Sequence, residues 1–212
     1  MMGDPQLAYP VIHITGSNGK TSTSRMITSL LVAHGLRVGT FISPHLETIE
    51  ERLALDGVPA TAGEFADAVA DLRPFVELFE DRTGSSPTYF ELTAALAFSY
   101  FAVNAVDVAV IEVGLGGRLD ATNAVDGKVA VVTGISLEHT SWLGNSLEEI
   151  ATEKLAIAKE GSVLVTGDLQ EQIRPLASGR AGELDIPHRR YGAEYHPEFV
   201  TMAVGGWAGS IS

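Results

Sequence analysis

The sequence PVIHITGSNGKTST (residues 10–23) begins with a short apolar run and passes through a glycine-rich loop into a helical pattern. The apolar run, Pro10–Thr15, is typical of a buried strand. Lys20–His34 has helical spacing, with Gly35 as its stop. Four apolar side chains are predicted on one side of that helix: Met26, Ile27, Leu30 and Leu31. A strand, a glycine-rich turn and a helix in this order begin an α/β sheet.

The remaining chain repeats this alternation. Further strands are predicted at Arg37–Ile42, Asp107–Val113, Lys128–Ile135 and Ser162–Thr166, with a short irregular or strand segment at Leu53–Val58. The helices between them are expected to begin at capping boxes, which lie at Thr61–Glu64, Thr88–Glu91 and Ser146–Glu149. The alternation predicts a doubly wound, mostly parallel sheet.

The three capped helices differ beyond their first turns. Pro74 is expected to kink or split the first of them. The helix after Thr88 is apolar nearly all round, which predicts burial against the sheet. The third is expected to run to about Lys159, where Gly161 stops it.

Composition restricts the class of protein. The chain has 212 residues, 45% of them hydrophobic, enough for one large α/β domain or one domain with an appendage. The formal net charge of −13 argues against a broad nucleic-acid-binding face. The absence of cysteine excludes disulfides and thiol chemistry. With no signal peptide and no apolar stretch long enough to span a bilayer, we expect a soluble, cytoplasmic protein without membrane partners.

Four loops should meet at one edge of the sheet. They are residues 15–23, 43–46, 114–123 and 136–144, and each comes after a predicted strand and is polar or rich in glycine. Because ligands of open parallel sheets bind beyond the carboxyl ends of the strands, these loops are the candidate site.

The first loop has the character of a phosphate loop. Its backbone N–H groups could surround phosphate oxygens at a helix N-terminus. Lys20 would then reach the β- and γ-phosphates, and Thr21 or Ser22 would face a magnesium ion. The match to the strict P-loop pattern is incomplete, because Ile14 stands where its first glycine belongs. The alternative is an ordinary glycine-rich turn with a solvated lysine.

Glu112 and His139 lie at predicted strand ends on the same edge. A carboxylate and an imidazole can bind a divalent cation, and Ser43 could add a hydroxyl. The alternatives are that Glu112 pairs with Arg118 and that His139 is a hydrogen-bonded loop residue. Considered one at a time, Glu112 and His139 favour these alternatives. Considered together, their position at the same sheet edge favours metal binding.

Lys154 shares a helix face with Ile150 and Ile157. Burial would lower its pKa, and a neutral amine can react with carbon dioxide to form a carbamate. On residue pattern alone, a lysine whose stem packs while its head reaches water is the stronger interpretation.

Six ordered motifs carry a family resemblance: TGSNGKTST, SPHLETIEERLALDG, TYFELTAALAFSYFA, VIEVGLGGRLDATN, LEHTSWLGNSLEEIATEK and LVTGD. In them the chain, from about Val11 to Gly167, resembles the folylpolyglutamate synthase and dihydrofolate synthase family of the Mur ligase superfamily. The resemblance implies a ligase that uses ATP to phosphorylate a pteroate or folyl-glutamate carboxylate. The amine of L-glutamate then displaces the phosphate to form an amide.

The resemblance also implies residue roles, with ATP and magnesium, expected as two ions, as the cofactors. Nucleotide-binding positions would be Gly16, Ser17, Asn18, Gly19, Lys20, Thr21, Ser22 and Asn123. Metal-binding positions would be Ser43, Glu112, His139 and Lys154, with Lys154 carbamylated. Catalytic roles would fall to Lys20, His139 and Lys154. Substrate positions would be His45, Arg52 and Arg118.

The chain departs from the family pattern in composition and length. Glu138 stands in place of the usual aspartate, Leu155 and Ala156 replace a small pair, and Thr21 stands where glycine is frequent. We expect residues 1–191 to form the P-loop ligase domain and residues 192–212 a tail or truncated segment. The family's C-terminal domain is not found in the sequence.

The sequence is compatible with two alternatives to the ligase. One is a truncated, non-catalytic module of the same ancestry that binds Mg-ATP, and the other is a different P-loop enzyme such as a small-molecule kinase. Glutamate-dependent phosphate release would separate the ligase from both. The family resemblance suggests a monomer.

Overall fold

The computed structural model describes the backbone of residues 1–203 and 206–211 and the side chains of residues 1–196 and Glu198. Its centre is an eight-stranded sheet in the order β4-β3-β2-β5-β1-β6-β7-β8. Six strands are parallel: β1 (Val11–Thr15), β2 (Val38–Phe41), β5 (Val108–Glu112), β6 (Gly127–Val132), β7 (Val163–Thr166) and β8 (His188–Arg190). Two antiparallel strands, β3 (Leu53–Leu55) and β4 (Val58–Pro59), complete one edge. The predicted doubly wound, mostly parallel sheet is confirmed.

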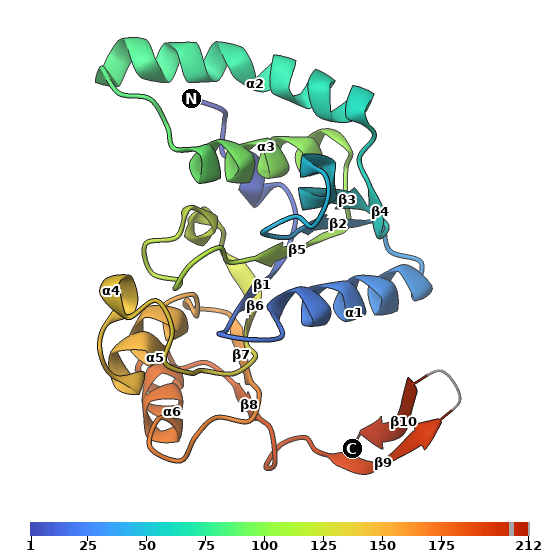
Figure 1. The fold of residues 1–212 in the computed structure, drawn as a ribbon, viewed down its shortest axis with the longest axis vertical. Coiled ribbons are helices and arrows are strands. Elements are labelled where there is room, and N and C mark those ends of the chain that lie inside the picture. Colours follow the sequence, from blue (N-terminus) through green and yellow to red (C-terminus); the bar gives the residue numbers. More distant parts are fainter. Residues whose placement is uncertain (204–205, 212) are drawn as a thin grey trace.

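Helices cover both faces of the sheet (Figure 1). The long helices are α1 (Lys20–Ala33), α2 (Ala62–Thr83), α3 (Tyr89–Val103), α5 (Leu147–Leu155) and α6 (Arg174–Glu183). Short turns are α4 (Thr140–Leu143) and the 3-10 helices Pro5–Leu7, Ile49–Arg52 and Ala121–Ala124. Helix α1 packs on one face, α3 and the α5–α6 pair pack on the other, and α2 lies outside α3.

Strand β1 lies at the centre, between β5 and β6. Every residue of β5 is buried, as expected for a strand covered on both faces. His13 is in register with Ile111 and Ala130, so it belongs to the face that α3 and α5 cover. The central strands therefore carry their carboxyl ends, Thr15 and Glu112, to one shared edge.

The predicted apolar side of α1 is only partly correct. Ile27 and Leu31 pack against the sheet, but Met26 and Leu30 are 58% and 63% exposed. The most buried side chains of α1 are Ser24 and Thr28, whose hydroxyls bond within the helix and, for Thr28, to Thr40 of β2. The small residues let the helix approach the sheet, so hydrophobicity alone misplaces the buried face.

The capping boxes at Thr61 and Thr88 form as predicted at the starts of α2 and α3. Helix α2 continues through Pro74 and is not split. The Ser146 hydroxyl accepts from Glu149, but the Glu149 carboxylate accepts from the Asn145 backbone instead of completing the box. Helix α5 ends at Leu155, short of the predicted Lys159.

The C-terminal segment forms a separate antiparallel hairpin, β9 (Pro197–Ala203) and β10 (Gly206–Ile211), which Figure 1 shows apart from the main sheet. The division into a domain of residues 1–191 and a tail stays a prediction. Across the described residues, no helix combines the length and apolar character that a membrane crossing requires.

Candidate functional site

The glycine-rich loop joins the end of β1 to the start of α1 in a conformation that needs glycine. Gly16 has φ +147° and Gly19, the N-cap of α1, has φ +81°. A Cβ atom on Gly16 would lie 1.9 Å from the Thr133 hydroxyl oxygen, so no side chain fits there. The loop consequently presents its backbone at the helix N-terminus, as an anion-binding loop does.

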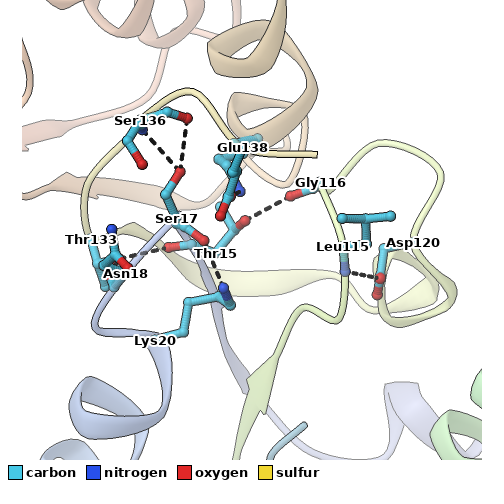
Figure 2. Close-up of polar contacts among 12 residues, drawn as sticks. Thr15, Ser17, Asn18, Lys20, Leu115, Gly116, Asp120, Thr133, Ser136 and Glu138 are labelled. Carbon is cyan, nitrogen blue, oxygen red and sulfur yellow. Dashed lines mark hydrogen bonds and ion pairs between the residues drawn. The ribbon is translucent and has the colours of Figure 1, made fainter. Parts of the chain in front are cut away.

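This loop is fastened to the segment that comes after β6 (Figure 2). The Ser17 amide donates to the Gly134 carbonyl at 2.7 Å. The Ser17 hydroxyl accepts from the Ser136 amide at 2.9 Å and lies 3.3 Å from its carbonyl. Thr133 donates its hydroxyl to the Asn18 carbonyl at 2.6 Å. The phosphate loop is therefore held in place by protein contacts.

A second fastening reaches the loop after β5. Thr15, the last residue of β1, donates its hydroxyl to the Gly116 carbonyl at 2.7 Å (Figure 2). Three of the four predicted loops therefore meet at one point, and hydrogen bonds fix their relative positions.

Lys20 and Thr21 are the first two residues of α1. The Lys20 ammonium donates to the Gly16 carbonyl at 2.8 Å, so its charge lies over the loop. The Thr21 hydroxyl donates to Glu112 Oε1 at 2.9 Å. Thr21, and not the exposed Ser22, is thus the hydroxyl that meets the strand-end carboxylate.

Glu112 is 1% exposed, and its Oε2 atom has no hydrogen-bond partner among the described residues. Burial raises the pKa of Glu112 to about 7, against the lowering effects of the Thr21 hydroxyl and the Lys20 charge. The alternative pairing with Arg118 is wrong, because Arg118 pairs instead with Glu153 at 2.7 Å. A buried acceptor oxygen at the phosphate loop suits a hard cation such as magnesium.

Lys154 is 2% exposed, and its ammonium lies 2.8 Å from Glu138 Oε1. Burial lowers the pKa of Lys154, while the hydrogen bond and charge of Glu138 oppose that shift. Burial acts to raise the pKa of Glu138, but Lys154, with smaller effects from Ser17 and Lys20, outweighs it and the net shift is downward. The interpretation in which the lysine head reaches water is therefore wrong.

The two other predicted metal positions, His139 and Ser43, differ in their surroundings. His139 is exposed and takes a left-handed conformation (φ +45°) as the N-cap of α4. Ser43 is buried beside Glu112. Within the residues that the structure describes, no group of three or more His, Asp, Glu or Cys side chains is placed to hold a metal. A magnesium ion here would depend on Glu112, hydroxyls, water and phosphate oxygens, a donor set that magnesium accepts.

The glycine-rich loop after β5 is ordered by Asp120. Its carboxylate accepts from the Leu115 amide at 2.9 Å and from the amide and hydroxyl of Thr122. The Thr122 hydroxyl also meets His13 Nε2 at 2.9 Å. Burial lowers the pKa of His13 to about 3, with a smaller effect from Lys159, so this ring is neutral.

The predicted nucleotide position Asn123 ends this loop. Its side-chain amide donates to the Arg118 carbonyl at 3.1 Å. Its Oδ1 atom is buried and has no partner in the described part of the chain.

The predicted substrate residues fall into two places. His45 and Arg52 lie together in the loop after β2, where Arg52 Nε donates to His45 Nδ1 at 3.0 Å. Arg118 lies apart from them, on the loop after β5, in its exposed pair with Glu153. Two further residues hold the phosphate loop, Thr133 and Ser136, and no sequence motif marks them. In the sequence Glu138 is only a departure from the family pattern, and its contact with Lys154 is seen in the structure alone.

These features define a P-loop α/β domain with a buried carboxylate at its phosphate loop. The model of the Mur ligase middle domain matches residues 14–183. The chain therefore belongs to the Mur ligase family, in the branch of the dihydrofolate and folylpolyglutamate synthases.

Relatives from this branch match nearly the whole chain. The dihydrofolate synthase/folylpolyglutamate synthase of Mycobacterium tuberculosis is 37% identical over 219 residues, which cover 97% of this chain and 45% of that protein. The enzyme of the same description from Bacillus subtilis is 41% identical over 172 residues, covering 81% of this chain and 40% of that protein.

Solved structures agree with the sequence matches. The Mycobacterium tuberculosis folylpolyglutamate synthase complexed with ADP has a TM-score of 0.94 at 36% identity, covering 99% of this chain and 48% of that one. A folylpolyglutamate synthase complex with AMPPCP and folate has a TM-score of 0.95 at 33% identity, covering 99% and 52%. The chain thus spans about half the length of the proteins it matches.

Proposed function

We propose that this chain is the nucleotide-binding part of an ATP-dependent ligase that joins L-glutamate to the carboxylate of a pteroate or folyl-glutamate. The observation that carries the proposal is the buried Glu112 carboxylate, with one oxygen on Thr21 and the other unpartnered among the described residues, beside a phosphate loop fixed by hydrogen bonds. The ADP, AMPPCP and folate complexes of its structural relatives support both the nucleotide and the acceptor class.

The proposed reaction has two steps. A carboxylate oxygen of the acceptor attacks the terminal phosphorus of ATP, which releases ADP and leaves an acyl phosphate. The amine of L-glutamate then attacks the acyl carbon, so that the amide forms, phosphate leaves and the amine loses a proton. Such chemistry depends on positioning and on neutralising phosphate charge more than on a covalent enzyme group.

The chain's own residues would position the nucleotide. The backbone of residues 16–19 and the Lys20 ammonium would hold the phosphates, with Thr21, Ser22 and Asn123 nearby. Glu112, Thr21 and Ser43 would hold magnesium, which supplies charge neutralisation at the phosphates. His139 and a carbamylated Lys154, for a second ion, stay proposals from the family resemblance, as do a catalytic role for His139, the monomeric state and the cytoplasmic location. The absence of nucleic-acid and membrane partners is likewise a prediction from the sequence.

The first test is calorimetric titration of Mg-ATP into this chain, beside Lys20→Ala and the matched control Lys128→Ala, which removes an exposed lysine on β6. We expect the wild type and the control to bind alike and Lys20→Ala to lose binding, because its ammonium would no longer meet the phosphates. Equal binding by a folded Lys20→Ala variant would overturn the assignment of the phosphate loop.

A second candidate function is a module of the same ancestry that binds Mg-ATP without forming the amide, because the contacts described at the phosphate loop bear on the nucleotide and not on amide formation. Phosphate release measured with pteroate, with and without L-glutamate, decides between the two. Release that depends on glutamate supports the ligase, while binding of Mg-ATP without such release supports the binding module.

A further inference from the structure

His13 places a polar ring in the middle of the central strand. Its side chain is 0% exposed, and the rest of β1 consists of aliphatic residues and a threonine. Burying an imidazole costs free energy unless its nitrogens are hydrogen-bonded, and the Nδ1 atom of His13 has no partner among the described residues. An aliphatic side chain would stabilise this strand position better. The benefit of the ring therefore lies in its contact through Nε2.

The partners of the Thr122 hydroxyl fix the direction of that contact. The hydroxyl has a single proton, which it donates to the Asp120 carboxylate. Toward His13 it can therefore only accept, so the neutral ring carries its proton on Nε2. A chain of donors thus runs in one direction from His13 through Thr122 to Asp120.

Asp120 closes the loop after β5, residues 114–123. Its carboxylate accepts from the Leu115 amide near the start of this loop, as Figure 2 shows. It also accepts from the Thr122 amide near the end of the loop. The loop is therefore a closed unit, and the contact between Thr122 and His13 attaches that unit to β1.

Two residues on one face of β1 hold this loop near its two ends. Side chains two positions apart in a strand point to the same face, as those of His13 and Thr15 do. Thr15 donates to the Gly116 carbonyl near the start of the loop, and His13 donates to Thr122 near its end. Because β1 continues from Thr15 directly into the phosphate loop, one strand sets the positions of both loops.

Asn123, the predicted nucleotide position, comes directly after Thr122. Its carbonyl accepts from the Lys159 ammonium at 2.7 Å, and its side-chain amide donates to the Arg118 carbonyl at 3.1 Å. Its Oδ1 atom is left without a partner in the described part of the chain. Because the backbone and the amide nitrogen are already held, a displacement of Thr122 would move the oxygen that is left for a ligand.

We propose that His13 is a positioning residue of the nucleotide site. Through Thr122 and Asp120 it holds the loop after β5 at the distance from the phosphate loop at which Asn123 reaches the nucleotide. This assignment rests on the proposed function, in which the phosphate loop binds Mg-ATP. It explains why a polar ring occupies a strand position where an aliphatic residue would be more stable. Stability and nucleotide affinity should therefore respond to His13 in opposite directions.

The test combines urea unfolding with calorimetric titration of Mg-ATP into the full chain. His13→Leu should unfold at the same urea concentration as the wild type or at a higher one. It should nevertheless bind Mg-ATP about 10-fold more weakly, the effect of one lost hydrogen bond that fixes the loop. His13→Gln should regain most of the affinity, because its amide N–H lies as many bonds from Cβ as the Nε2–H of histidine does.

Thr122→Val breaks the same chain of donors at a second point. It should weaken Mg-ATP binding, and the double variant His13→Leu/Thr122→Val should bind as Thr122→Val does, because both substitutions remove one contact. The matched control is Thr93→Val, which removes a buried threonine hydroxyl that donates within α3. This control should bind Mg-ATP as the wild type does.

Two measurements need no nucleotide. Amide hydrogen exchange should show less protection at Leu115 and Thr122 in His13→Leu than in the wild type, and unchanged protection at Val110 in β5. Nitrogen-15 NMR of the wild type should show the Nε2–H tautomer of His13 throughout the range from about pH 5 to 8, because burial keeps the pKa of this ring at about 3.

Each outcome separates this inference from the assignment of the phosphate loop. Loss of Mg-ATP binding in Lys20→Ala, with equal binding by His13→Leu and the wild type, would overturn the inference and leave the phosphate loop standing. Parallel loss of stability and affinity in His13→Leu, or full loss of the gain in His13→Gln, would also overturn it. If His13→Leu fails to fold, Thr122→Val decides. If the wild type does not bind Mg-ATP, both assignments fail, and reduced amide protection then reflects a structural contact only.

Discussion

At the scale of single residues, Glu112 shows how a carboxylate buried at the phosphate loop opposes stability. Its folded pKa of about 7 lies above the ordinary value of 4.5, so the folded state holds this proton more tightly than the unfolded chain does. Its contribution to stability is greatest below pH 4.5 and falls as the pH rises to about 7, by about 3 kcal/mol at most.

Glu112→Gln should therefore remove this loss. We expect the difference in unfolding free energy between Glu112→Gln and the wild type to grow in favour of the variant from pH 4.5 to about pH 7 and then level off. Denaturant unfolding across that range measures it, with Glu160→Gln, an exposed carboxylate, as the control. A constant difference across the range would mean that Glu112 titrates normally. Mg-ATP binding by the Gln variant should be lost.

At Gly16 both the backbone conformation and the surrounding packing exclude a side chain. Gly16→Ala places a Cβ against the Thr133 hydroxyl at φ +147°. We expect the unfolding free energy to fall by about 3 kcal/mol, from strain and overpacking together, with loss of Mg-ATP binding.

The double variant Gly16→Ala/Thr133→Ala tests the cause of that loss. It should recover part of the stability, because the closest contact is gone while the strained φ and the approach to the Gly134 carbonyl remain. If the double variant loses as much unfolding free energy as the two single variants lose together, Thr133 is not the obstacle.

The residue types at the candidate site could be predicted from the sequence more completely than the contacts between them. Glu112 could be singled out because a charge at the end of a buried strand is conspicuous, and it lies at the phosphate loop as expected. The pairing of Glu138 with Lys154 and the bonds from Thr133 and Ser136 could not be foreseen. They join segments far apart in the chain through common residue types, and only the fold brings them together.

At the scale of elements, Pro74 makes α2 weaker than its length suggests. It is exposed within a continuous helix and cannot donate the hydrogen bond of an ordinary helical residue. Pro74→Ala should raise the unfolding free energy by about 1–3 kcal/mol. Thermal unfolding measures the gain, and Glu77→Ala on the same helix should change little. No gain in Pro74→Ala would mean that a local bend at the proline is needed for packing on α3.

Element boundaries were predictable where a local signal fixes them. The hydroxyls of Thr61 and Thr88 begin their helices at the expected residues, because an N-cap depends on neighbouring residues alone. The end of α5 and the buried face of α1 depend on tertiary contacts. For that reason the predicted helix end near Lys159 and the predicted packing of Met26 are wrong.

At the scale of the whole molecule, contacts to the sheet continue past residue 191, the predicted domain boundary. The Tyr195 hydroxyl donates to the Thr166 carbonyl at the end of β7, its ring packs edge-on against Tyr191, and Glu194 pairs with Arg190. We therefore expect a chain ending at His196 to be as stable as the full chain, and one ending at Tyr191 to lose about 1–2 kcal/mol.

Urea unfolding of the two shortened chains measures this difference. Tyr195→Phe in the full chain isolates the hydrogen bond and should account for about 1 kcal/mol of it. Equal stability of both shortened chains would support the boundary predicted from the sequence.

The two edges of the main sheet have a consequence for behaviour in concentrated solution. One edge is β4, only two residues long and ending in Pro59, which has no N–H to donate. The other is β8, three residues long, in which Arg189 and Arg190 are exposed. Strands this short, one with a proline and one with exposed charged side chains, are poor templates for pairing with a second copy. The β-sheet core should therefore resist edge-to-edge aggregation.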